Sequence, residues 1–112
     1  MTAPQVSRRK LLSASVPSGK LVSKVEIQEV SLGPGAAAPL HLHPCPTMGV
    51  VTEGRIVFQI EGEAAQTLKP GDAFYEPANA RVSKFNNESS APAKFAVFYL
   101  LSEGEQDTIR IL

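Results

Sequence analysis

The chain has 112 residues, 43% of them apolar, and its 11 Lys and Arg balance its 11 Asp and Glu to a formal net charge of zero. This length allows one domain with a substantial core but not two, and the charge balance gives no footprint for nucleic acid. No segment approaches the roughly 20 apolar residues of a membrane-spanning helix. The single cysteine excludes an internal disulfide and is compatible with a reducing compartment. We therefore expect a cytoplasmic protein with neither nucleic acid nor membrane as a partner.

The chain begins with a polar segment that shows no sustained period, and residues 1–20 are interpreted as an N-terminal arm. Lys20–Leu32 is the first predicted strand, in which Val25 and Ile27 share one parity with other apolar residues. Towards the end of this segment the apolar residues change parity. A bulge or bend near Glu29 would explain that change.

From residue 33 onwards, turns rich in Gly and Pro separate short alternating segments. The further predicted strands are Pro39–His43, Gly49–Thr52, Arg55–Ile60, Ala65–Leu68, Ala73–Glu76, Arg81–Asn86 and Lys94–Leu101. Many short strands at such spacing, with no helical period, indicate an all-β sandwich or barrel over residues 21–101. The charged tail, residues 102–112, is expected to end in an edge strand or to pack on a partner.

The only two histidines of the chain, His41 and His43, lie two residues apart in a predicted strand. Residues i and i+2 of a strand point to the same side, so both imidazoles share one face. Two neutral imidazoles side by side form a natural metal-binding pair. The alternative is a pair of surface histidines without a function.

The setting of this pair resembles the first signature segment of the small single-domain cupins, whose pattern is Gly-x5-His-x-His-x3 or 4-Glu-x6-Gly. In this chain the same spacing is occupied by Gly35, His41, His43, Thr47 and Gly54. The resemblance implies an RmlC-like double-stranded β-helix, that is, a jelly-roll barrel.

A second segment is similar to the other cupin signature, Gly-x5-Pro-x-Gly-x2-His-x3-Asn. Here the spacing is occupied by Gly71, Pro77, Asn79, Val82 and Asn86. Asn79 stands at a family glycine, and Asn is the best substitute where a positive φ is needed. With the strands around them, the two segments extend over residues 25–101, which is most of the chain.

The resemblance also implies a metal site, built from two histidines and a glutamate of the first segment and a histidine of the second. Thr47 and Val82 stand at the positions of the glutamate and of the last histidine. Loss of even a supporting partner weakens metal affinity roughly 10–100-fold, and loss of direct ligands costs more. Weak or no metal binding is therefore predicted for a site that retains only His41 and His43.

Two other residues are candidates for the missing ligands. Cys45 could offer a thiolate suited to Zn or Cu, or it could be a buried cysteine without a role. Glu76 shares a parity with Phe74, so its carboxylate is expected inside the barrel, as a metal ligand or as a general acid or base. The alternative for Glu76 is a salt bridge at the surface or between subunits. The candidate cofactor is one divalent ion, Zn, Fe, Ni or Mn, or none.

Four functions are compatible with this sequence. The first is a barrel that binds a small organic molecule, with weak or no metal binding. The second is a metal-dependent oxygenase, isomerase or lyase that uses His41 and His43. The third is catalysis without metal, with the candidates His41, His43 and Glu76, and the fourth is a barrel kept only for assembly. The expected wall of the ligand pocket consists of Met48, Val51, Phe58, Phe74, Val82 and Phe98.

The resemblance further implies a homodimer, because small cupins often pair through sheet edges and terminal segments. The edges of an incompletely closed barrel provide the physical reason. The expected contact segments are Val22–Val30 and Ile109–Leu112.

Overall fold

The computed structural model describes residues 5–112, so the first four residues of the predicted arm lie outside the described part of the chain. Residues 5–112 form strands and no helix, and hence no helix that could cross a membrane. The strands are β1 (Lys24–Leu32), β2 (His41–Leu42), β3 (Thr47–Glu53), β4 (Ile56–Ile60), β5 (Gln66–Leu68), β6 (Ala73–Glu76), β7 (Val82–Asn86), β8 (Ala93–Leu101) and β9 (Arg110–Ile111).

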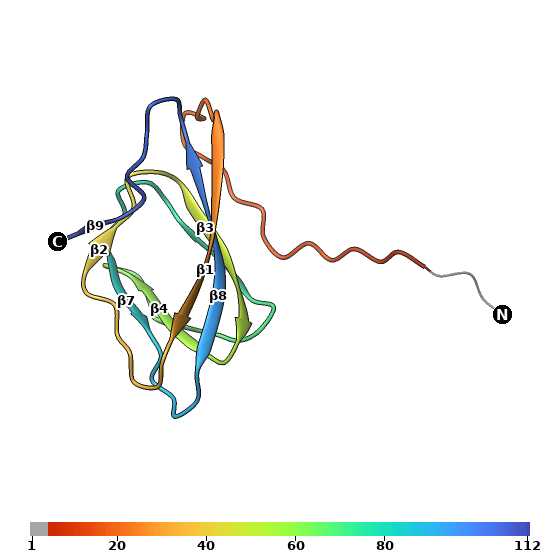
Figure 1. The fold of residues 1–112 in the computed structure, drawn as a ribbon, viewed down its shortest axis with the longest axis vertical. Helices are drawn as coiled ribbons and strands as arrows, with labels where there is room; N and C mark the ends of the chain where they lie inside the picture. The colour runs from red at the N-terminus through yellow and green to blue at the C-terminus, as the bar shows by residue number, and fades with distance from the viewer. Residues whose placement is uncertain (1–4) are drawn as a thin grey trace.

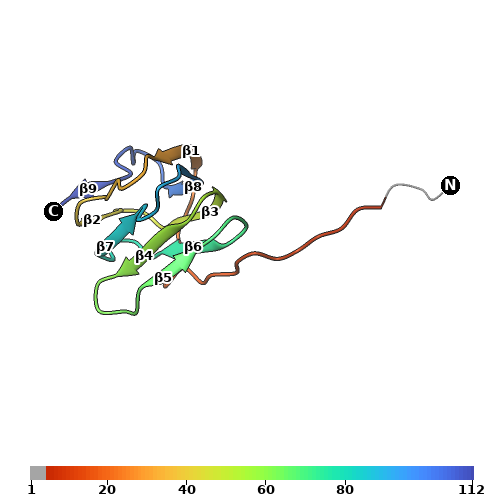
Figure 2. The ribbon, with the colours of Figure 1, turned by 90° about the horizontal axis from the view of Figure 1, so that it is seen from below.

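The strands form two antiparallel sheets that face each other, as Figures 1 and 2 show. One sheet has the order β1-β8-β3-β6 and the other the order β5-β4-β7-β2-β9. Except for β4 and β5, neighbours in each sheet are not consecutive in sequence, as a jelly roll requires. The predicted fold class, an all-β jelly-roll barrel, is confirmed.

Strand β1 does not contain the bulge that the sequence predicted near Glu29. Its pairing with β8 runs without interruption from Lys24 to Leu32. Val25 and Ile27 point out of the barrel, with exposed fractions of 49% and 63%, whereas the alternate residues are half-buried. The strand is apolar on both parities because its outer face is apolar at one end and its inner face at the other. A change of apolar parity therefore did not require a change of register.

The core of the barrel is a cluster of phenylalanine rings. The rings of Phe74, Phe85 and Phe95 contact one another, with centroids 4.7–5.9 Å apart. Gly49 of β3 faces this cluster, and a Cβ there would collide with the ring of Phe74 and with the carbonyl oxygen of Ala96. Glycine is thus required at residue 49 by the close approach of its neighbours.

The two ends of the chain lie differently against the barrel. The arm leads away from it, and a turn closed by a hydrogen bond from Gly19 N to Val16 O, at 2.9 Å, joins the arm to the sheet (Figure 1). The tail returns to the barrel, where β9 pairs with β2. The backbone N–H of Leu112 donates to Leu40 O at 3.0 Å. The tail therefore contacts the strand that carries the first histidine.

Candidate metal centre

Both histidines point into the barrel, on the one shared face that their two-residue spacing predicted. The exposed fractions of His41 and His43 are 5% and 6%, and their ring centroids lie 5.1 Å apart with the planes nearly perpendicular. Strand β2 is held between β7 and β9, which fixes the direction of the His41 ring, and His43 follows this strand directly. The surface-histidine alternative is therefore excluded.

Backbone carbonyl groups set the tautomer of each imidazole. Nδ1 of His41 lies 2.7 Å from Pro39 O, and Nδ1 of His43 lies 2.6 Å from Thr108 O. A carbonyl oxygen only accepts hydrogen bonds, so each Nδ1 carries the hydrogen and donates it. In the neutral ring this leaves the lone pair on Nε2. Both imidazoles are thereby prepared to bind a cation through Nε2, in the way that metal-ligating histidines are commonly held.

The carboxylate of Glu76 completes the group. Glu76, at the end of β6, is 2% exposed, and its Oε2 lies 2.6 Å from Nε2 of His43. In the pairing of β3 with β6, Glu76 stands directly opposite Thr47. The carboxylate thus comes from the strand beside the one on which the cupin signature places it. Glu76 points inward, as its parity with Phe74 predicted.

These three side chains fit a divalent cation. The candidate donor atoms of His41, His43 and Glu76 all lie within 4.8 Å of one another. Ligand bonds of about 2.0–2.2 Å require donors no more than about 4.4 Å apart, which a small side-chain adjustment achieves. Without a cation or a proton between them, the lone pair of His43 Nε2 would face the carboxylate, and no other hydrogen-bond donor reaches Glu76 Oε2 from the described residues.

The electrostatics of the site favour a shared positive charge. Burial lowers the pKa of His43, but the hydrogen bond and charge of Glu76, together with the Thr108 carbonyl, bring this pKa above its ordinary value of 6.5. Burial, and then the charge of Glu76, raise the pKa of Tyr99 to about 12. The Tyr99 hydroxyl therefore keeps its proton and is a permanent hydrogen-bond donor near neutral pH.

Cys45 and Val82 lie close to the centre without belonging to the donor group. Cys45 is 1% exposed, its Sγ lies 3.9 Å from Oγ1 of Thr47, and burial raises the pKa of its thiol. Thr47 Oγ1 donates to Cys45 O at 3.0 Å, so its hydroxyl is directed at the backbone. Val82 stands directly opposite His41 in the pairing of β2 with β7. An apolar side chain thus occupies the place of the histidine in the second signature.

The turn at Asn79, in the second signature segment, contacts the backbone of the first segment. Asn79 adopts a positive φ of 66°. Asparagine tolerates this conformation best among the residues other than glycine, which explains why it can stand at the glycine position of the signature. Its backbone N–H donates to His43 O at 2.8 Å. The turn between β6 and β7 therefore fixes the backbone of the second histidine.

A cavity of about 210 Å³ opens from the three donors into the barrel. One end carries His41, His43, Glu76, Tyr99 and Thr108, and the other is walled mainly by aliphatic and phenylalanine side chains. Of the six residues expected to form the pocket wall, Phe74 lines this cavity.

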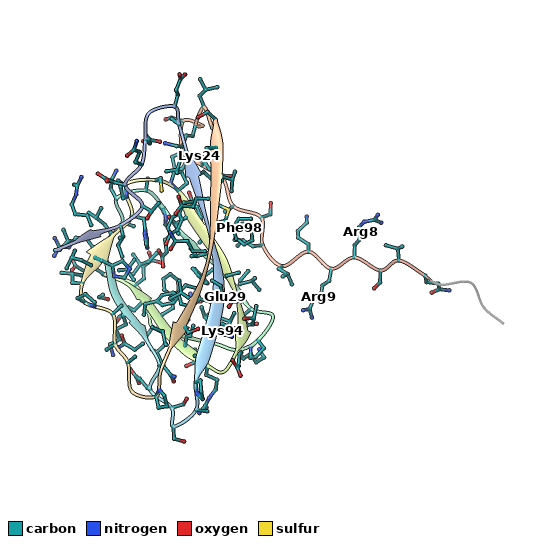
Figure 3. The ribbon with its side chains drawn as sticks, in the orientation of Figure 1. Arg8, Arg9, Lys24, Glu29, Lys94 and Phe98 are labelled. Atoms are coloured by element: carbon teal, nitrogen blue, oxygen red, sulfur yellow. The ribbon has the colours of Figure 1, made fainter. Side chains whose placement is uncertain are left out.

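The other five expected wall residues lie elsewhere. Val51, Phe58 and Val82 are buried in the core but do not line the cavity. Met48 and Phe98 have the outward parity of their strands and stand directly opposite each other on the outer face of the sheet. Phe98 is labelled in Figure 3.

Three polar residues of the lining were not foreseen, namely Gln28, Tyr99 and Thr108. The sequence did indicate the direction of Tyr99. Its position in β8 has the opposite parity to that of the charged Lys94, so its side chain is expected on the buried face. Thr108 had none, since it contributes a backbone carbonyl from the tail.

The fold and this donor group together define a protein of the cupin class. The sequence family described as the cupin domain matches residues 28–99. The chain therefore belongs to the cupin family.

Solved structures with the same fold include several enzymes. An oxalate oxidase in complex with glycolate superposes with a TM-score of 0.68 at 22% identity, covering 79% of this chain and 46% of that one. The DMSP lyase DddQ from Ruegeria pomeroyi DSS-3 gives 0.67 at 20% identity, with coverages of 78% and 42%. A sugar phosphate isomerase of the cupin superfamily, from Silicibacter pomeroyi DSS-3, gives 0.62 at 31% identity, with coverages of 71% and 52%.

The chain thus spans about half the length of these solved proteins. No curated protein is significantly similar to it in sequence.

Proposed function

We propose that this cupin binds one divalent metal ion through His41, His43 and Glu76, and that it is an enzyme acting on a small organic molecule in the barrel. The observation that carries the proposal is the orientation of both imidazoles. Each donates Nδ1–H to a backbone carbonyl, which leaves Nε2 available; Nε2 of His43 faces the buried Glu76 carboxylate, and a donor atom of His41 lies within 4.8 Å of both. Polar groups buried in this way without a partner are costly unless a cation binds between them.

Two imidazoles and one carboxylate are suited to Fe, Mn, Ni or Zn. A bound ion would supply Lewis-acid activation of an oxygen atom of the substrate, since three protein donors leave positions for substrate and water. The protein's own groups would orient the substrate and exclude water. The Tyr99 hydroxyl, which remains protonated, would donate a hydrogen bond to charge that develops on the substrate.

The solved enzymes with this fold support the proposal at the level of the fold. They act on different substrates, so the likeness gives no reaction for this chain. The reaction class must therefore come from the site, where the donor group and the adjacent cavity are compatible with an isomerase, a lyase or an oxygenase.

The second candidate is a barrel that binds a small molecule without metal. The replacement of two usual ligands by Thr47 and Val82 favours it. In that case His43 and Glu76 would share a proton, and their contact would be an ion pair within the protein.

Metal analysis of the purified protein separates the two candidates. After dialysis against each of Mn, Fe, Ni and Zn in turn, we expect about one ion per chain for at least one metal. The His43→Ala variant and the Glu76→Gln variant should each bind at least 100-fold more weakly, because each loses a direct ligand. Lys94→Ala, on the outer face, is the matched control and should bind like the wild type. Less than a tenth of an ion per chain with every metal would overturn the metal proposal.

A further inference from the structure

We propose that the substrate is a small monoanion with an apolar body, such as an aromatic or branched aliphatic monocarboxylate. Its charged head would bind at the metal, and its body would lie against the phenylalanine cluster. This inference rests on the proposed metal site and adds the chemical class of the ligand.

The charge of the lining residues selects a monoanion. Among the residues that line the cavity, none is Lys or Arg, and Glu76 is the only carboxylate. A divalent ion with neutral His41 and His43 and ionised Glu76 therefore leaves one positive charge, which a monoanion neutralises. A dianion would bring one uncompensated negative charge into a buried site, and such burial is strongly unfavourable.

Charged residues near the cavity do not reverse this selection. Glu26 of β1 lies on the inward parity, and its charge contributes to the raised pKa of Tyr99. Its carboxylate accepts a hydrogen bond from Gln28 and is half-buried outside the cavity lining. This further negative charge close to Tyr99 disfavours a dianion more than a monoanion. Phosphate esters, which usually need Arg or Lys, are accordingly poor ligands.

The other end of the cavity selects an apolar body. Its wall contains the rings of Phe74, Phe85 and Phe95 and the side chains of Val30, Leu32 and Val97. Burial of apolar surface there contributes about 25 cal/mol per Å². None of these six side chains carries a hydroxyl, amide or charge that would pair with a sugar-like body, and Gln28, whose amide lines the cavity opposite Val97, already donates to Glu26.

The size of the cavity limits the ligand to a small one. Its volume of about 210 Å³ is roughly seven times the ~30 Å³ that a water molecule occupies in the liquid. Drug-sized ligands occupy cavities of about 300–1,000 Å³. A ligand of roughly 7–12 non-hydrogen atoms therefore fits, which includes benzoate and a six-carbon branched acid.

Tyr99 is the residue that would recognise the head. It lines the cavity next to His43, with ring centroids 5.5 Å apart, and lies directly opposite Thr47 in the pairing of β3 with β8. A protonated hydroxyl in this place donates a hydrogen bond to a carboxylate, a contact stronger than one between neutral groups.

The test is a titration of the metal-loaded protein, by calorimetry and by thermal shift, with matched probes. Benzoate, cyclohexanecarboxylate and 4-methylpentanoate carry the predicted head and body. Acetate lacks the body, benzamide lacks the charge, and phenyl phosphate is largely a dianion at pH 8. We expect at least one of the three monocarboxylates to bind at least tenfold more tightly than acetate, benzamide and phenyl phosphate.

Two variants place the ligand in the cavity. Val30→Phe fills the apolar end from the edge strand β1 and should weaken monocarboxylate binding at least tenfold. Tyr99→Phe should weaken it roughly tenfold, since it removes only the hydroxyl. In both variants the metal content should stay near one ion per chain, which also shows that the barrel has folded.

The outcomes distinguish this inference from the metal proposal. If the protein binds no metal, the proposed function fails first. If metal binds, the inference is overturned when no monocarboxylate binds, when phenyl phosphate or acetate binds equally well, or when Val30→Phe changes nothing.

Discussion

Two neighbouring rows of residues cross the four-stranded sheet on opposite faces, and their polarity is the reverse of what a soluble sheet usually shows. The row inside the barrel is largely polar and consists of Glu26, Tyr99, Thr47 and Glu76. The row one residue further along, on the outer face, is apolar except for one hydroxyl and consists of Ile27, Phe98, Met48 and Tyr75.

The contrast between the two rows shows that the inner row is polar and the outer row apolar for different reasons. Inside, polar groups are retained where they surround the three candidate metal donors, because a cation or a bound ligand can satisfy them. On the outer face, apolar side chains are open to water, and Ile27 is 63% exposed. An apolar outer face of this kind is typical of an interaction surface. The homodimer expected from the family resemblance stays a prediction, for which this row is a physical motive.

The largest expected effect concerns the position of the carboxylate in the inner row. Thr47 and Glu76 are directly opposite each other, so the carboxylate can be moved from one strand to the next. Glu76→Gln should lower metal affinity at least 100-fold, and adding Thr47→Glu should recover at least tenfold of it. Metal titration of the single and double variants measures both steps. A double variant no better than Glu76→Gln would show that residue 47 does not reach the donor group.

The outer row predicts a change of assembly without a change of the site. Ile27→Glu places a charge in the apolar row and should weaken the predicted dimer at least tenfold. Light scattering across a concentration series measures this. Ser31→Glu, on the same face of β1 but beyond the apolar row, is the matched control and should leave the dimer intact. Metal content should be equal in all three proteins, and a wild type that is monomeric at micromolar concentration would contradict the prediction.

The smallest expected effect is a pair of opposite pH dependences. The pKa of His43 is raised above 6.5 in the folded protein, so its protonated form stabilises the fold below that value, and this contribution is lost as pH rises through the raised pKa. The melting temperature of the metal-free protein should fall by about a few degrees between about pH 6 and pH 8.

Metal binds the deprotonated ring, so metal affinity should rise over the same interval. Thermal melts with and without metal, in wild type and in His43→Gln, measure both dependences. Without metal, the melting temperature of His43→Gln should fall less between about pH 6 and pH 8 than that of the wild type. Equal slopes in the two metal-free proteins would show that the pair of His43 and Glu76 does not contribute.

Much of this molecule followed from local patterns. The resemblance of the segment around His41 and His43 to a cupin signature implied a jelly-roll barrel, and the alternation of the strand predicted that both rings share one face. The parity of Glu76 with Phe74 predicted an inward carboxylate. The two predictions of side-chain direction succeeded because side chains alternate between the two faces of a strand.

The sequence by itself determined the all-β fold, the shared face of the two histidines and the turn at Asn79, because each depends on strand period, turn chemistry or signature spacing. Only the tertiary structure decided which strands are neighbours. It therefore decided that Glu76 stands opposite Thr47 and that the tail brings the Thr108 carbonyl to Nδ1 of His43. Such contacts join residues far apart in the chain, and no local period encodes them.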